Sequence, residues 1–525
     1  MLADQVAGLL MFGFQGTAAA DVPRDLVAQA GGVILFRRNI KDAQQVRELT
    51  DAIRSLARDS EAPPLIALDQ EGGTVSRLAQ IGTTTPSAMA LGAVRDPAAT
   101  ESMYHLIGDE LGTLGFTVDF APVADINNNP DNPVIGLRSF GDDPHAVGLN
   151  VRAAIRGLHA ASVAATAKHF PGHGDTTIDS HFDLPSIPRD LAHVRAVELV
   201  PFSAAITEGV DVIMTAHALF PAIEERGKAA TLSHRILSEL LRDELRYQGV
   251  VATDCMEMKA IEANHTPEAA AVEAVAAGAD LILFSHTPDK VRRARDALRA
   301  AVLDGRLSGE RVQQSLQRVA KLRRRLAANN ISRPPLDTVG SERHKQAALA
   351  VARRAITLVR DPNSLLPLRL SKEERLLVIE FGDEQPSGVE DVDRHRKTVI
   401  GPALGASEAR LHEQVRSLDP AGHEYKQMLM ASGSANAVVA ITTRAKQHPL
   451  QARAVADLAM LGKRVIAVAG REPYDAEVLP AALTVIASYG EDAGAMQAAA
   501  DVILGKISPL GKLPVSLRAP LQAAP

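Results

Sequence analysis

The sequence predicts a (β/α)8-type, TIM-like barrel followed by a smaller α/β sandwich domain. Short apolar runs alternate with amphipathic stretches through the N-terminal part of the chain, and such repeated strand–helix units imply a parallel sheet. Several of the runs are almost continuously aliphatic, as expected of parallel strands that are buried on both faces. Seven such runs over this length fit a closed barrel better than a doubly wound sheet.

The elements of the first domain follow in order from the N-terminus. Residues 1–17, MLADQVAGLLMFGFQGT, lack a basic n-region, so we expect them to form the first helix and strand and not a signal peptide. The amphipathic stretches 42–58 and 233–245 are expected to be helices. The seven strand-like runs lie at 32–36, 65–69, 116–120, 164–168, 210–214, 249–253 and 279–284.

A domain boundary is expected at NNISRPPL (329–336), because its Asn residues and its Pro-Pro pair are typical of a loop between regular elements. We therefore predict a barrel at 1–327, a linker at 328–340 and a second α/β domain at 341–525. A helix at 342–359 is expected to lead into that domain. Its strand-like runs lie at 376–381, 437–441, 465–469 and 483–487.

Composition excludes several classes of protein. Among the 525 residues, 46% are hydrophobic and 23% charged, which is ordinary for a globular protein. The net charge of −6 argues against a nucleic-acid partner, and no apolar stretch is long enough to span a membrane. Cys255 is the single cysteine, which fits a reducing compartment, so we expect a cytoplasmic protein. No feature of the sequence indicates an oligomeric state.

Reactive polar residues follow the ends of the strand-like runs. In a barrel these ends meet on one rim, where active sites are built. Five positions in phase therefore predict a single converging site. The residues are Asp69, Asp125, Lys168 with His169, His217 and Asp254.

The segment KHFPGHGDTTIDSH at 168–181 is the densest in titratable groups. Asp179 and His181 are two positions apart, so the carboxylate could bind one ring nitrogen and raise the basicity of the other. Alternatively, His169 and His173 hold the loop by hydrogen bonds, or the histidines bind a metal. Metal ligation by an i, i+4 pair needs a helix, which Pro171 opposes, so we expect no metal and no cofactor.

Three further segments contribute candidates. Asp254 ends a buried strand and fits a nucleophile, a ligand for a hydroxyl group or the N-cap of the next helix. Asp69 and Arg77 flank a Gly-Gly pair, and they could bind a ligand or form a buried ion pair. Arg138 is the only cation of the Asn- and Pro-rich loop at 125–142, from which it could reach the pocket.

Together these segments resemble glycoside hydrolase family 3, and within it the β-N-acetylglucosaminidase branch. The resemblance is collinear over the barrel and rests on long motifs. The second domain is similar too, in a lead-in helix at 345–357 and a closing motif at 500–515. The barrel motifs are DQEGGTVSR (69–77), FAPVADINNNPDNPVIGLRSFGDDP (120–144), KHFPGHGDTTIDSH (168–181) and GVVATDCMEM (249–258).

The resemblance implies a role for each matched residue. Asp254 falls on the nucleophile, His181 on an unusual histidine acid/base and Asp179 on its dyad partner. Thr74 departs from the family, which often has a basic residue there. The implied sugar-binding positions are Asp69, Arg77, Arg138, Lys168, His169 and Met214.

The implied activity is removal of terminal β-linked N-acetylglucosamine from chito-oligosaccharides or cell-wall fragments, with retention through a glycosyl-aspartate. Aromatic residues are only 3% and tryptophan is absent, so a small polar pocket is expected rather than a long groove. The partner is then a small sugar.

Four alternatives remain open at this point. A phosphorylase would use phosphate in place of water. A β-glucosidase or β-xylosidase of the same family would take its acid, a carboxylate, from the second domain. A metal-dependent hydrolase would use the histidines as ligands. A sugar-binding protein without activity is disfavoured, because both implied catalytic groups are present.

Overall fold

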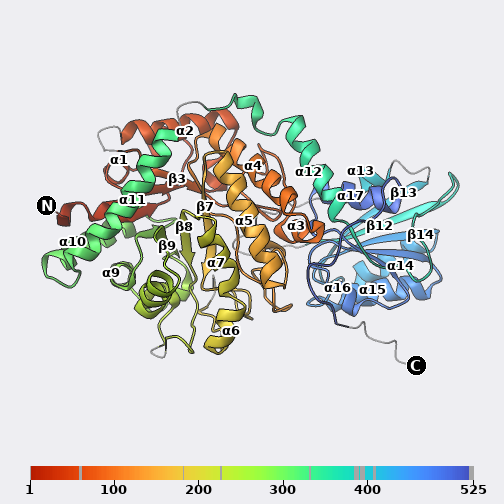
Figure 1. The fold of residues 1–525 in the computed structure, drawn as a ribbon. Coiled ribbons are helices and arrows are strands. Elements are labelled where there is room, and N and C mark those ends of the chain that lie inside the picture. Colours follow the sequence, from red (N-terminus) through yellow and green to blue (C-terminus); the bar gives the residue numbers. More distant parts are fainter. Residues whose placement is uncertain are drawn as a thin grey trace.

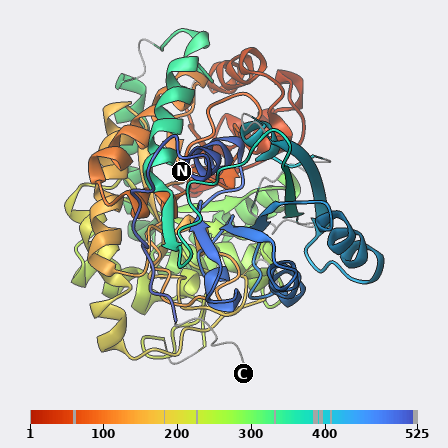
Figure 2. The same cartoon turned by 90° about the vertical axis from the view of Figure 1, so that its right-hand side faces the viewer.

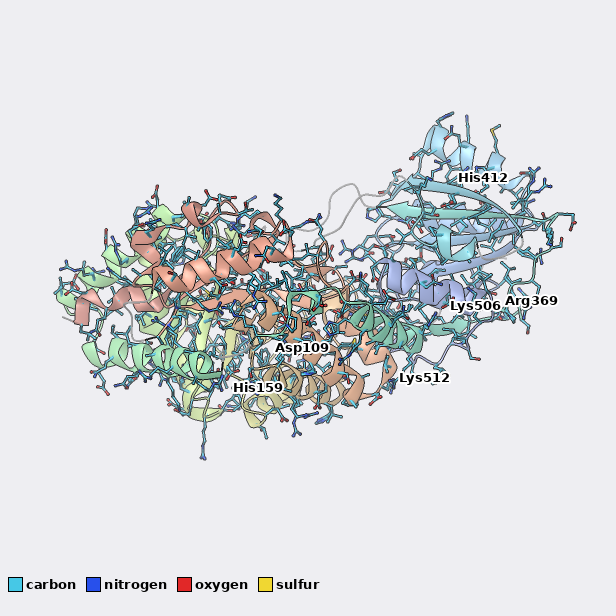
Figure 3. The ribbon with its side chains drawn as sticks, turned by 90° about the horizontal axis from the view of Figure 1, so that it is seen from above. Asp109, His159, Arg369, His412, Lys506 and Lys512 are labelled. Carbon is cyan, nitrogen blue, oxygen red and sulfur yellow. The ribbon has the colours of Figure 1, made fainter. Side chains whose placement is uncertain are left out.

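The computed structural model describes residues 2–57, 62–180, 183–224, 227–329, 333–382, 390, 397–405 and 409–518. Figure 1 shows a large barrel lobe beside a smaller sheet lobe, with α12 (Glu342–Ala355) running between them. The same division appears from above in Figure 3, where Asp109 and His159 mark the barrel lobe and His412 the smaller one. The predicted fold class is confirmed.

Eight parallel strands close the barrel in the order β1-β10-β9-β8-β7-β6-β3-β2. All seven strand-like runs of the first domain contribute a strand, and the eighth comes from the N-terminus. The strands are β1 (Leu10–Phe12), β2 (Gly32–Ile34), β3 (Leu65–Leu68), β6 (Val118–Asp119), β7 (Ala164–Phe170), β8 (Val212–Thr215), β9 (Val250–Cys255) and β10 (Leu281–Phe284).

Helices surround the barrel. Because the strands are parallel, the chain must return along the outside after each strand, and the returning helices bury the outer face of the sheet. In place of the helix expected before β1, the chain forms two 3-10 turns, η1 (Leu2–Asp4) and η2 (Val6–Leu9). The stretch at 233–245 forms a π-helix, η7 (Arg235–Glu244). The α-helices are α1 (Arg24–Val27), α2 (Ala43–Leu56), α3 (Ala88–Val94), α4 (Pro97–Leu114), α5 (Pro144–Ala160), α6 (Leu191–Ala196), α7 (Leu199–Thr207), α8 (Lys259–Glu262), α9 (Pro267–Ala277), α10 (Pro288–Leu303) and α11 (Gly309–Asn329).

Helix α11 closes one end of the barrel. Its Val319, Leu322 and Leu326 lie one helical turn apart and pack with the interior side chains of the strands. Its basic residues pair with carboxylates at the same end: Arg311 Nη2 lies 2.6 Å and Arg318 Nη1 3.2 Å from Asp280 Oδ1. Figure 1 shows α11 along the barrel, away from the second lobe.

The second lobe contains a six-stranded sheet in the order β11-β16-β15-β14-β12-β13. Only the β11–β16 pair is antiparallel. The strands are β11 (Thr357–Arg360), β12 (Arg375–Gly382), β13 (Arg410–Ser417), β14 (Ala437–Thr442), β15 (Arg464–Ala469) and β16 (Thr484–Ala487). The helices are α12, α13 (Gly401–Leu404), α14 (Gly422–Ser432), α15 (Pro449–Met460), α16 (Asp475–Val478) and α17 (Ala493–Ile503).

One prediction for this lobe is wrong at its end, and one strand was missed. The helix predicted at 342–359 ends at Ala355, because 357–360 pairs with β16 as strand β11. Strand β13 was not predicted, since its sequence RLHEQVRS is polar and half-exposed, as is common at a sheet edge. The segment predicted as a linker contains η8 (Leu336–Thr338), a short 3-10 turn.

The two lobes share an apolar cluster. Figure 2 views the molecule end-on, with the smaller lobe in front of the barrel. Ser87 Oγ donates a 2.6 Å hydrogen bond to the carbonyl oxygen of Tyr489, and Asn127 Nδ2 donates to Tyr474 Oη at 3.0 Å. The buried cluster contains Met89, Ala90, Ala93 and Leu137 of the barrel with Ala355, Ala469, Tyr474, Ala487, Tyr489 and Val515. This cluster holds the second lobe against the barrel rim.

Among the described residues, none of the helices has the length and apolar character required to cross a bilayer.

Asp280 offers a test of how the barrel is held together. It is fully buried before β10 and is bound by Arg242, Arg311 and Arg318. Changing Asp280 to Ala leaves these guanidinium groups without their counter-charge, so we expect the free energy of unfolding to fall by about 3–5 kcal/mol. Urea denaturation measures this. Asp296→Asn, at an exposed carboxylate beside Arg295, is the control and should change little; equal effects would contradict the assignment.

Candidate active site

The carboxyl ends of the barrel strands surround a cavity of about 500 Å³. Its lining includes most of the residues predicted from the sequence, which are Asp69, Arg77, Arg138, Lys168, His169, Met214 and Asp254. Asp179 is buried beside the cavity, and its neighbour Ser180 lines it. His181 lies outside the described residues. The strand-end residues His217 and Asp125 are buried and do not line the cavity.

Asp254 belongs to strand β9 and is half-buried, in contrast to the fully buried residues before it. Its Oδ1 accepts a 2.6 Å hydrogen bond from the backbone nitrogen of Cys255. It is not the cap of the next helix, because α8 has Met258 at its N-cap. Burial raises the pKa of the neighbouring Cys255 thiol to about 12, so that group is not a nucleophile at neutral pH.

A buried network of ions forms one wall of the cavity. Glu71 accepts two hydrogen bonds of 2.8 Å from the Arg138 guanidinium group, and Lys168 Nζ lies 2.6 Å from Glu71 Oε1. Lys168 also donates to Asp69 Oδ1 at 2.8 Å, and Arg77 lies 3.7 Å from the other oxygen of Asp69. The ion pair that the sequence offered as one of two alternatives for Asp69 and Arg77 is therefore present, within a network that faces the cavity.

The network holds Glu71 and Lys168 in their charged forms. Burial alone would raise the pKa of Glu71, but Arg138 and Lys168 outweigh it and hold that pKa far below the usual range. Burial would likewise lower the pKa of Lys168, but Asp69 and Glu71 raise it. The wall therefore presents fixed charges to a ligand, which suits hydrogen bonding to sugar hydroxyls.

His169 is oriented by Asp125. Its Nδ1 lies 2.6 Å from Asp125 Oδ2, and a carboxylate can only accept, so Nδ1 carries the proton. Its Nε2 then accepts from Arg138 Nη2 at 3.4 Å. Sequence reasoning placed Asp125 at a strand end but gave it no role; its position under His169 explains why a carboxylate is there.

His173 holds the loop that follows β7. Its Nε2 lies 3.0 Å from Ser180 Oγ and its Nδ1 3.2 Å from Thr176 Oγ1. Burial lowers the pKa of His173 to about 4, so the ring is neutral at physiological pH. The alternative in which this histidine supports the loop by hydrogen bonds fits these contacts, and both of its nitrogens are occupied.

The second lobe contributes Glu390 to the cavity lining. Its carboxylate binds Arg471 and lies 3.6 Å from Arg444 Nη2. Burial would raise the pKa of Glu390, but these arginines outweigh it and lower that pKa. A general acid needs a pKa near the working pH. This carboxylate is therefore poorly suited to protonate a leaving group.

Some residues of the cavity lining, and Glu71 in the buried ion network behind it, were not predicted from the sequence. Glu71 lies in the motif DQEGGTVSR, and its signal was its place two residues after the strand-end Asp69. Glu390 had no sequence signal, because only packing between lobes brings it to the barrel rim. The remaining missed polar residues of the lining are Arg37, Arg38, Glu257, Lys259, Ser285 and His286.

Replacing Glu71 by Gln tests the ion network. At pH 7 the change leaves two buried cations without their shared anion, so we expect a loss of about 3 kcal/mol in the free energy of unfolding. The pKa of Glu71 is lowered in the fold, so its contribution exists above the unfolded value of about 4.3 and is lost as pH falls below it. The difference from wild type should therefore shrink in acid.

Urea unfolding of both proteins between pH 7 and pH 3 measures this difference. Glu239→Gln, at an exposed position, serves as the control. A difference that stays constant or grows on acidification would show that Glu71 is not held as the anion of the network.

Comparisons with known proteins agree with this geometry. The model described as the N-terminal domain of glycosyl hydrolase family 3 matches residues 1–322. The chain is 32% identical to "Beta-hexosaminidase A" of Pseudoalteromonas piscicida over 93% of its own length and 89% of that relative. It is 40% identical to "Beta-hexosaminidase" of Alkalilimnicola ehrlichii over 54% of its length and 82% of that protein.

Solved structures give the same result over both lobes. A glycoside hydrolase family 3 β-N-acetylglucosaminidase from Paenibacillus sp. str. FPU-7 superposes with a TM-score of 0.92 at 39% identity, covering 99% of this chain and 100% of that one. A fungal multi-domain β-N-acetylglucosaminidase superposes with a TM-score of 0.90 at 33% identity, covering all of this chain and 62% of that one. The chain belongs to glycosyl hydrolase family 3.

Proposed function

We propose that this glycoside hydrolase is a retaining exo-β-N-acetylglucosaminidase. The observation that supports it most is the meeting of Asp254, the charged wall around Lys168 and the Ser180 end of the loop in one small cavity. A cavity of about 500 Å³ suits one terminal sugar better than a long chain. The similarity to β-hexosaminidases and to a β-N-acetylglucosaminidase supports N-acetylglucosamine as that sugar.

In the proposed mechanism Asp254 attacks the anomeric carbon while His181 protonates the leaving oxygen. The glycosidic bond breaks, and a covalent glycosyl-aspartate forms with inverted configuration. His181 then takes a proton from water, whose oxygen attacks the anomeric carbon and frees Asp254. Two inversions retain the configuration.

Asp179 is proposed to orient His181 and to favour its protonated form. An imidazole has a reference pKa of about 6.5, near working pH, so it needs less tuning than a carboxylic acid. The loop position supports this role, since Ser180 between the two residues lines the cavity and is fixed by His173. Asp69, Arg77, Arg138, Lys168, His169 and Met214 are proposed to bind the sugar.

The cellular role is part of the same proposal. A cytoplasmic enzyme of this type would remove N-acetylglucosamine from cell-wall fragments during recycling. The single cysteine, Cys255, fits a reducing compartment.

Trapping tests the nucleophile. A slow fluorinated N-acetylglucosaminide should label Asp254, and mass spectrometry of the digested protein locates the label. Asp254→Asn should lower kcat by about 10⁴-fold or more, because the covalent step is lost. A label on another residue would contradict the mechanism. Turnover with added phosphate that yields sugar 1-phosphate would indicate a phosphorylase instead.

The source of the proton is tested by a pair of variants. His181→Ala should lower kcat by about 10²–10⁴-fold on substrates with poor leaving groups, and less on activated aryl glycosides. Glu390→Gln, the matched change in the second lobe, should retain most of kcat. The reverse pattern would favour a β-glucosidase-like arrangement with its acid in the second domain.

A further inference from the structure

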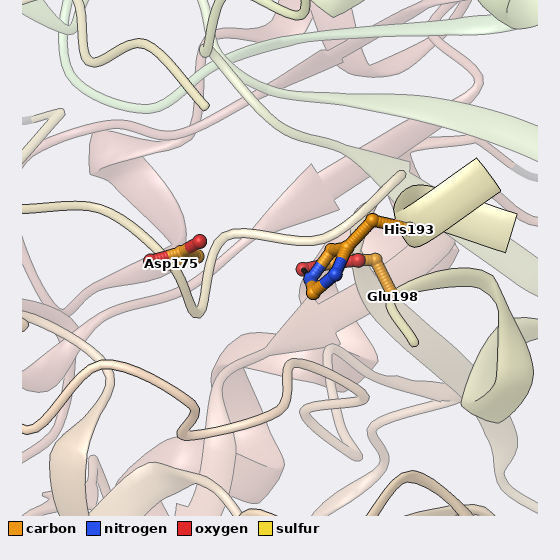
Figure 4. A group of neighbouring side chains, drawn as sticks. All are labelled: Asp175, His193 and Glu198. Atoms are coloured by element: carbon orange, nitrogen blue, oxygen red, sulfur yellow. Dashed lines mark ion pairs between the residues drawn. The ribbon is translucent and has the colours of Figure 1, made fainter. Parts of the chain in front are cut away.

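A second group of ligating side chains lies outside the cavity, beneath the loop that bears Asp179. Asp175 comes from this loop, His193 from α6 and Glu198 from the residue before α7. Each offers one ligand atom, and these atoms all lie within 4.8 Å of one another. Figure 4 shows the His193 ring beside the Glu198 carboxylate, with Asp175 facing them from the loop.

The group contains buried polar atoms that lack a partner. The Glu198 side chain is 2% exposed, and its Oε1 accepts from Asn128 Nδ2 at 3.1 Å. Its Oε2 has no hydrogen-bond partner among the described residues, and neither has the buried Nε2 of His193. A buried carboxylate oxygen without a donor is costly, so this arrangement calls for a positive partner.

The charges around Glu198 agree with this need. Burial raises the pKa of the Glu198 carboxyl; the Asn128 hydrogen bond and the His193 charge lower it by less, and Asp175 adds a small raising effect. His193 Nε2 lies 3.6 Å from Glu198 Oε1, too far for a hydrogen bond. Arg189 pairs with Oδ2 of Asp175 and leaves its other oxygen available. Among the described residues, His193 is therefore the basic group within 4 Å of Glu198, and it makes no hydrogen bond to that carboxylate.

We propose that Asp175, His193 and Glu198 bind one divalent transition-metal cation of the Zn²⁺ type. One imidazole with two carboxylates suits Zn²⁺, whereas Mg²⁺ and Ca²⁺ favour oxygen ligands throughout. Ligands of a tetrahedral Zn²⁺ at about 2.0–2.2 Å lie about 3.3–3.6 Å apart, so the three groups, whose ligand atoms lie within 4.8 Å of one another, need to approach by about an ångström to close around the ion. This departs from the expectation that the chain takes no metal.

The cation would act as a structural clamp: it would hold the loop in place and take no part in the reaction. It would fasten Asp175, four residues before Asp179, to the start of α7. The loop already lies directly on Glu198: at Gly172, where φ is +136°, an added Cβ would come within 2.9 Å of Glu198 Cβ. That the clamp holds the catalytic loop rests on the proposed function; that the site binds a cation does not.

Titration with Zn²⁺ alone tests the site. After stripping with a chelator, the full-length protein should bind one equivalent by isothermal calorimetry. Glu198→Gln, which keeps the side chain's shape, and His193→Asn should each weaken this binding by about tenfold or more. His448→Gln is the control, since His448 lies 2.6 Å from Asp419 in another ion pair. X-ray absorption should show one imidazole and oxygen ligands.

The proposal would be overturned if the wild-type protein did not bind Zn²⁺, or if Glu198→Gln and His193→Asn both bound it as tightly as wild type. The three side chains would then form only a hydrogen-bonding and ionic network. Zn²⁺ held by the cavity histidines would instead be lost in His169→Asn and kept in Glu198→Gln. Circular dichroism checks that each variant folds, and Asp175→Asn provides a third variant.

The clamp has its own readout. Zn²⁺ should slow amide hydrogen exchange in the loop at 172–180 of wild type, and it should not do so in Glu198→Gln. Asp254→Asn should bind Zn²⁺ as wild type does. Failure to trap a glycosyl-enzyme would therefore count against the proposed function alone, whereas failure of the titration would count against the cation site alone.

Discussion

The site depends on one buried anion, Glu71, which holds two cations from different parts of the chain. Arg138 comes from the long loop after β6, and Lys168 from strand β7. With all three side chains almost fully buried, each charge is stable only because the others are present. The network therefore fixes the positions of three segments of the rim relative to one another, and it presents Lys168 and Asp69 to the cavity.

The barrel supplies the frame for this network. Parallel strands direct their carboxyl ends to one rim, so Asp69, Lys168 and Asp254 meet although they are far apart in the sequence. The hairpin of β4 (Gln70–Gly72) and β5 (Val75–Ser76) turns the chain back directly after Asp69. This turn places Arg77 on the same cavity wall as Asp69, and it places Glu71 in the buried network behind that wall.

The loop after β7 is held by side chains and not by regular structure. Asp125 accepts hydrogen bonds from the backbone nitrogens of His169 and His173, at 3.1 Å and 2.7 Å. Asn132 Nδ2 donates to the carbonyl oxygens of His173 and Gly174. Two loops of the rim thus order each other, which explains why this part of the chain is rich in Asn, Asp and His.

The second lobe completes the wall of the cavity on one side. Arg471 binds Glu390 and keeps its carboxylate charged at the cavity edge. The apolar cluster around Tyr474 and Tyr489 fixes this lobe against α3 and the loop at 125–142. Its contribution visible in the structure is therefore to shape and charge one side of the pocket.

The sequence by itself determined the barrel, because hydrophobic periodicity is local and repeats with every strand–helix unit. It also determined Asp69, Arg77, Arg138, Lys168, His169, Met214 and Asp254 as candidates for one site, through strand ends and long family motifs. The boundary between α12 and β11 was missed because Thr357–Arg360 becomes a strand only by pairing with β16. Polar β13 likewise depends on its neighbour β12.

Only the tertiary structure decided which charges pair. Glu71 was indistinguishable from any other acidic residue of its motif until folding placed it between Arg138 and Lys168. Glu390 reaches the cavity through packing between lobes. Asp175, His193 and Glu198 converge from a loop, from α6 and from the residue before α7. Ionic contacts act over a few ångströms in space, and distances of this kind are not encoded by local patterns in the chain.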